Sequence, residues 1–88
     1  MKINTYFILR ELAGETILVP TGKAAQNFNG MLCLSETAAF IWKILPDTDG
    51  AEEVVQALLD EYDVDEETVR KDVEAFFVMA KENDLISS

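Results

Sequence analysis

A turn, a short apolar strand, a helix cap and a helix follow one another without a linker between residues 29 and 45. Asn29-Gly30 favours the positive φ angles of a tight turn. The next four residues, Met31-Leu32-Cys33-Leu34, are typical of a strand that is covered on both faces. Ser35 can then accept a hydrogen bond from the first free N–H groups of a helix. We therefore expect strands before this stretch and helices after it.

The N-terminal part of the chain predicts an antiparallel hairpin. Residues 6–12 and 15–20 are rich in aromatic and aliphatic side chains, and Ala13-Gly14 can form the two-residue turn between them. This turn sets a register in which Leu9 faces Leu18, Ile8 faces Val19 and Arg10 faces Ile17. Residues 21–27 are expected to form a polar connection or an irregular extension.

Three helices are predicted in the rest of the chain, over residues 36–45, 51–62 and 66–83. Pro46 ends the first helix, and Trp42 is expected in the core. Asp65 can cap the third helix. Helical spacing predicts that this helix buries Val69, Val73, Phe76, Phe77 and Ala80, and that Thr68, Asp72, Ala75 and Met79 flank this stripe.

These elements predict an α+β fold like that of a winged helix-turn-helix, with a three-stranded antiparallel sheet followed by three helices. A chain of 88 residues has room for one hydrophobic core, so residues 1–88 are expected to form a single domain. No apolar run is long enough to span a membrane, and no signal-peptide pattern begins the chain, so a cytoplasmic location is expected.

The negative charge is concentrated in the second half of the chain. Residues 47–88 carry three basic and fourteen acidic side chains, a net charge of −11, whereas the whole chain carries −10. This field repels phosphate backbones and anionic lipid surfaces. Nucleic acid and membrane are therefore not expected as partners, whereas a basic peptide or protein surface is, although the acids could also serve solubility alone.

The residue types needed for catalysis are scarce. There is no histidine, and Cys33 has no basic neighbour in sequence that would lower its pKa, so we expect it to be a small core residue. Calcium-loop and glycine-rich phosphate-binding patterns are absent, and no cofactor or metal is expected. An acyl carrier protein is rejected because no serine lies in an Asp-Ser-Leu motif.

Short motifs spread along the chain resemble those of one known family. In order, they are Val19-Pro20-Thr21-Gly22, Leu34-Ser35-Glu36-Thr37-Ala38 with Ile41-Trp42, Glu53-Val54-Val55, Glu61-Tyr62-Asp63-Val64, Asp72-Val73 with Phe76, and Asp84-Leu85-Ile86. This set resembles the PqqD-like proteins, which are named after a component of pyrroloquinoline quinone biosynthesis. The resemblance extends over about residues 6–86, and the family usually has Asn where this chain has Ser35.

The resemblance implies a RiPP recognition element, a winged-helix-like domain that binds the leader of a ribosomally synthesised precursor peptide. Such a peptide chaperone is not an enzyme, and it presents the precursor to a modifying enzyme, often a radical S-adenosylmethionine (SAM) protein. The leader is held as an added strand on the third strand, beside the third helix. Carried over to this chain, the expected peptide-binding residues are Met31, Leu32, Cys33, Leu34, Asp72, Ala75, Phe76 and Met79.

The resemblance also implies roles for these side chains. Phe76 and Met79 would accept apolar anchors of the leader, and Asp72 would pair with a leader Lys or Arg. The residues themselves support this site in two ways: an open strand edge is a template for strand addition, and Ala75 with Met79 puts a small residue next to an adaptable one. The alternative reading places Phe76 and Leu32 in the ordinary core.

The sequence also fits a second function. The chain could be a winged-helix protein-protein interaction module that has no leader peptide as its ligand. The sequence also leaves open whether the edge of the third strand is free or is paired with a second copy in a homodimer.

Overall fold

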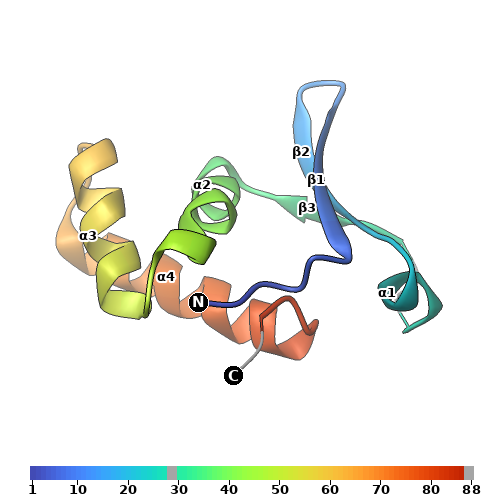
Figure 1. The fold of residues 1–88 in the computed structure, drawn as a ribbon. Helices are drawn as coiled ribbons and strands as arrows, with labels where there is room; N and C mark the ends of the chain where they lie inside the picture. The colour runs from blue at the N-terminus through green and yellow to red at the C-terminus, as the bar shows by residue number, and fades with distance from the viewer. Residues whose placement is uncertain (28–29, 87–88) are drawn as a thin grey trace.

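The computed structural model describes residues 1–27 and 30–86, and its ribbon is shown in Figure 1. A three-stranded antiparallel sheet is followed by helices, which confirms the predicted α+β fold. The elements are β1 (Phe7–Leu12), β2 (Glu15–Pro20), α1 (Lys23–Asn27), β3 (Leu32–Leu34), α2 (Glu36–Ile44), the 3-10 turn η1 (Leu45–Asp47), α3 (Ala51–Glu61) and α4 (Glu66–Glu82).

The β1–β2 hairpin has the predicted turn and register. Ala13 and Gly14 have φ angles of 51° and 82°, the left-handed region that a two-residue hairpin turn requires. Opposite pairs are Ile8 with Val19, Leu9 with Leu18 and Arg10 with Ile17, as predicted. The turn chemistry therefore sets the register of the sheet, and the hairpin projects beyond the helices (Figure 1).

The connection between β2 and β3 differs from the prediction, because residues 23–27 form the short helix α1 rather than an irregular segment. Gly22 has a φ of 53°, and the backbone N–H groups of Ala24 and Ala25 donate to Thr21 and Gly22. Thr21 is itself held by the hairpin, since its N–H and its hydroxyl both donate to the carbonyl of Tyr6, at 2.8 and 2.6 Å.

β3 is shorter than predicted and only one of its faces is covered. Leu32 and Leu34 pack against the core, whereas Cys33 is exposed. The predictions that this strand is covered on both faces and that Cys33 is a core residue are therefore wrong. The reason is the two-residue period of a strand, which turns Cys33 to the side opposite Leu32 and Leu34, where it lines an open pocket rather than the core. Of the predicted Asn29-Gly30 turn, Asn29 lies outside the described residues, and Gly30 has a φ of 110°.

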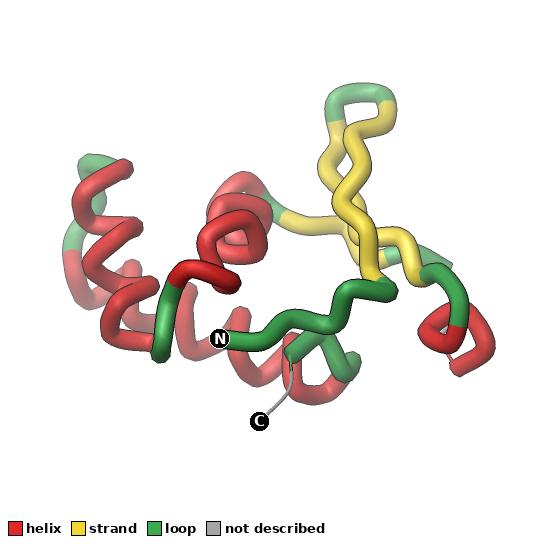
Figure 2. The backbone as a smooth tube through the Cα atoms, viewed as in Figure 1, coloured by secondary structure: helices red, strands yellow, loops and turns green. Residues whose placement is uncertain are grey.

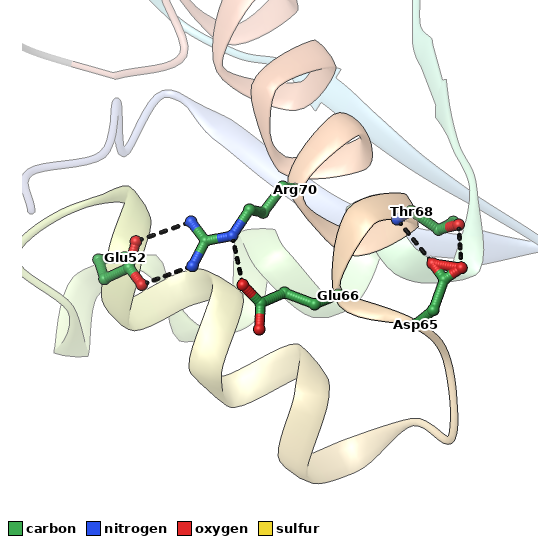
Figure 3. Close-up of polar contacts among 5 residues, drawn as sticks. All are labelled: Glu52, Asp65, Glu66, Thr68 and Arg70. Carbon is green, nitrogen blue, oxygen red and sulfur yellow. Dashed lines mark hydrogen bonds and ion pairs between the residues drawn. The ribbon is translucent and has the colours of Figure 1, made fainter.

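Local caps begin α2 and α4 where the sequence predicts them. The Ser35 hydroxyl accepts a hydrogen bond from the backbone N–H of Ala38 at 3.1 Å. Asp65 accepts one from the N–H of Thr68 at 2.9 Å and another from its hydroxyl at 3.1 Å (Figure 3). The last predicted residue of the first helix, Leu45, instead begins η1, which contains Pro46.

The core is built from buried side chains of the sheet, α2, α3 and α4. The predicted stripe of α4 is buried at Val69, Val73, Phe76 and Ala80, while Phe77 is half-buried. Trp42 is buried, as predicted. The fully buried large side chains are Leu18, Ile41, Leu45, Val54, Leu58 and Leu85.

The two ends of the chain lie side by side along α4 (Figure 2). Ile3 and Ile86 form an antiparallel bridge, and the N–H of Asn4 donates to the carbonyl of Leu85 at 2.7 Å. The terminal amine of Met1 donates to the carbonyl of Thr48. Because Leu85 is buried, this tail belongs to the core.

Candidate functional site

The edge of β3 is open along the side that faces away from β2. In the described ranges 1–27 and 30–86, the strand order is β1-β2-β3, and β3 pairs only with β2. An edge strand presents unpaired N–H and C=O groups to any extended segment that approaches it. Leu32 and Leu34 both face the core, so side chains of an added strand that lie opposite them would face the same way, toward the helices.

A pocket of about 410 Å³ opens between the beginning of α2 and the middle of α4. Because Ser35 directly follows β3 and caps α2, the first turn of α2 lies beside the end of the strand. The walls of the pocket are mainly apolar, and its only charged lining residue is Asp72. We call it the α2–α4 pocket; its lining residues are Ser35, Thr37, Ala38, Ile41, Asp72, Ala75, Phe76 and Met79.

All four residues predicted from the third helix line this pocket. Asp72 and Ala75 are exposed at its rim, Met79 is half-buried, and Phe76 is only 4% exposed. Phe76 thus belongs to the core and to the pocket at the same time. Asp72 makes no ion pair with any residue in the described part of the chain, which leaves its carboxylate available to a cation.

The four residues predicted from the strand do not line the α2–α4 pocket. Leu32 and Leu34 contribute the covered face of β3, beside the core residues. Met31 precedes the strand and is 57% exposed. Cys33 and Leu34 line a separate pocket of about 540 Å³ between the hairpin and α2.

The hairpin-side pocket is bordered by an aromatic pair. The rings of Phe40 and Tyr62 meet edge to face, with centroids 5.6 Å apart. Burial raises the pKa of the Tyr62 hydroxyl, and the nearby carboxylates of Glu36 and Glu61 raise it further. The phenol therefore remains neutral at physiological pH.

Sequence reasoning missed the contribution of α2 to the pocket. Thr37, Ala38 and Ile41 form the wall opposite α4, yet in the sequence they are ordinary positions of an apolar helix. The signal that could have found them is the missing linker between β3 and α2, which forces the first turn of α2 to lie next to the strand edge.

The chemistry of these residues fits recognition of a peptide. Among residues 1–27 and 30–86, no group of three Cys, Asp or Glu side chains could hold a metal ion. None of the helices described is long and apolar enough to cross a membrane. The arrangement supplies a backbone edge, an apolar pocket and one carboxylate at its rim.

Comparison with known proteins agrees with this geometry. Residues 15–86 match the family described as coenzyme PQQ synthesis protein D (PqqD), which is most of the chain. The protein belongs to the PqqD family. The PqqD match begins at β2 and ends at Ile86, so it includes β3, α2 and α4. A search of curated proteins found no match.

Two solved structures resemble this PqqD-family chain along its length. One is TbiB1 in complex with the TbiA(beta) leader peptide, with 25% sequence identity and a TM-score of 0.74, covering 100% of this chain and 96% of that chain. The other is a lasso peptide synthetase B1 complexed with the leader peptide, with 23% identity and a TM-score of 0.73, covering 99% of this chain and 96% of that chain. The second likeness concerns the fold alone.

Proposed function

We propose that this chain binds the leader of a ribosomally synthesised precursor peptide by strand addition to the open edge of β3. The observation that carries the proposal is the position of this edge, immediately next to the α2–α4 pocket. Main-chain hydrogen bonds along an edge give affinity, and pockets for alternate side chains give specificity. The structural likeness to TbiB1, which was solved with a leader peptide, supports the same function.

The leader is held by three contributions in this proposal. The backbone of residues 31–34 pairs with it, Phe76 and Met79 receive an apolar side chain, and Asp72 pairs with a Lys or Arg. The negative charge of the second half of the chain favours a leader with basic residues.

The chain acts without catalysis in this proposal, as one recognition domain over residues 1–88. It presents the bound precursor to a modifying enzyme, such as a radical SAM maturase. The chain has no histidine, and Asp72 is the only charged side chain that lines the α2–α4 pocket. These residues offer little for general acid–base chemistry.

The proposal is tested by an NMR titration of the isotope-labelled domain with the leader of the nearest encoded short precursor. We expect chemical shift changes to cluster at residues 31–34 and 72–79. A flat titration with several such leaders, on a folded sample, would contradict the proposal and favour the interaction module that has no leader.

Two variants test the position of the site, and a third variant serves as the control. Met79→Glu puts a charge into the α2–α4 pocket, and Leu32→Pro removes a backbone donor from β3; each should lower leader affinity at least about tenfold, or about 1.4 kcal/mol. Val64→Glu is the control, because Val64 is 47% exposed and lies between α3 and α4, outside the site. Unchanged affinity in both site variants, with the fold retained, would show that the peptide binds elsewhere.

A further inference from the structure

The outer surface of α4 exposes an apolar side chain that the core does not use. Val78 is 52% exposed, and it lies one helical turn from Glu74 and one turn from Glu82 along the same stripe of the helix. Together with Lys71, Ala75 and Met79, these three residues line a shallow depression of about 380 Å³. We call this surface the α4 ridge.

The α4 ridge is continuous with grooves on both sides. Ala75 and Met79 also line the α2–α4 pocket, so the ridge begins at the proposed leader site. On the other side, Val78 lines a larger groove of about 970 Å³, together with Phe77, Val73 and Val55. An apolar surface therefore extends around α4 from the leader site to α3.

Two aromatic side chains of α4 are in contact with each other, and each lines one of these grooves. Phe76 lines the α2–α4 pocket, and Phe77 lines the larger groove that extends to α3. Their rings meet edge to face, with centroids 5.8 Å apart. A protein seated on the ridge would therefore lie against the same helix that holds the leader.

The unpaired charges beside Val78 are negative, because Lys71, the basic residue that lines the ridge, pairs with Glu67 at 3.6 Å. In the part of the chain that the structure describes, the carboxylates of Glu74 and Glu82 have no ion pair. They stand about 12 Å apart along the helix, since each residue adds about 1.5 Å. A second copy of this chain would carry the same charge of −10 and be repelled, whereas a basic surface would be attracted.

We propose that the α4 ridge is the docking surface for the enzyme that modifies the bound precursor. The complementary surface on the enzyme places an apolar side chain over Val78 and basic side chains beside Glu74 and Glu82. This inference rests on the proposed function, because the shared residues Ala75 and Met79 bring the enzyme next to the leader.

The test uses the full chain, its precursor leader and the purified modifying enzyme encoded nearest to that precursor. Enzyme affinity for the domain–leader complex is measured by calorimetry, and leader affinity is measured separately without the enzyme. Val78→Asp should weaken enzyme binding at least about tenfold and leave leader affinity within about twofold. The double variant Glu74→Lys, Glu82→Lys should also weaken enzyme binding and should make that binding depend less on salt concentration.

Matched controls distinguish the ridge from a general effect of charge. Val64→Asp alters a similarly exposed valine away from the ridge, and Asp60→Lys reverses a charge on α3; both should leave enzyme binding unchanged. The inference is overturned if the enzyme does not bind, if Val78→Asp and Val64→Asp act equally, or if Val78→Asp only separates a dimer of this chain. If the wild type does not bind the leader, the proposed function is overturned instead, since leader affinity is measured without the enzyme.

Discussion

Arg70 donates two hydrogen bonds from its guanidinium group to the carboxylate of Glu52 and thereby links α4 to α3. Nη1 and Nη2 each donate to a different carboxylate oxygen of Glu52 at 2.9 Å, while Nε donates to Glu66 at 2.8 Å (Figure 3). Such a bidentate geometry is specific to arginine. These hydrogen bonds hold the pKa of Glu52 below its ordinary value.

The first prediction concerns this ion pair. Arg70→Gln should lower the midpoint of thermal unfolding by a small amount, because the pair is exposed to solvent and is screened by salt. Lys71→Gln is the control, since the Lys71–Glu67 pair is longer at 3.6 Å and more exposed. Thermal unfolding at low and high salt checks this, and equal effects of the two substitutions would contradict it.

The second prediction concerns the buried tail. Leu85→Ala should reduce the free energy of unfolding by about 2–5 kcal/mol, because it leaves a cavity beside the core. Ile86→Ala is the control at a half-buried position and should cost less. Urea unfolding measures both, and a loss below about 1 kcal/mol for Leu85→Ala would show that the tail is not part of the cooperative core.

The third prediction concerns the helix cap beside the site. Ser35→Ala should cost about 1 kcal/mol, since it removes the acceptor for the N–H of Ala38. Ser35→Asn should preserve stability, because asparagine caps helices as well as serine does. Chemical unfolding of the two variants decides this, and similar losses in both would mean that the hydroxyl acts through packing instead.

The fourth prediction concerns acid. Hydrogen bonds from the Thr68 hydroxyl and backbone N–H hold the pKa of Asp65 below its ordinary value of 3.8. A depressed pKa adds stability that is complete above the ordinary value and is lost as pH falls through the folded-state pKa. Asp65→Asn should therefore show a smaller loss of stability than the wild type between about pH 5 and pH 2. Urea unfolding across this range, with Asp63→Asn as the control, tests it; identical pH profiles for wild type and Asp65→Asn would contradict it.

The fifth prediction concerns the volume of the α2–α4 pocket. Ala75→Trp should fill the pocket from its exposed rim and lower leader affinity at least about tenfold, or about 1.4 kcal/mol. Ala25→Trp on α1 is the control, because Ala25 is exposed and outside the pocket. Calorimetric titration with the leader gives both affinities, and retained binding in Ala75→Trp would place the leader side chains elsewhere.

Much of the secondary structure could be predicted because its signals are local. The Ala13-Gly14 turn set the hairpin register, and the side chains of Ser35 and Asp65 marked the beginnings of α2 and α4. Each of these signals acts within a few residues of chain, so no knowledge of distant contacts was needed.

The errors fall where distant contacts decide. The five residues of α1 are too few for a helix that is stable on its own, and they are anchored through Thr21, which donates to the carbonyl of Tyr6 just before β1. Cys33 is exposed because the core packs against the opposite side of β3, through Leu32 and Leu34. An apolar tripeptide cannot reveal which of its faces will be covered.

For the candidate site, the sequence by itself determined the residue types on α4: a carboxylate, a small residue and two large apolar side chains on adjoining faces. Only the tertiary structure decided that the first turn of α2 would lie opposite them and close the pocket. The physical reason is that helical periodicity fixes which residues share a face, whereas the partner of that face depends on how the buried side chains of α2, α3 and α4 pack together.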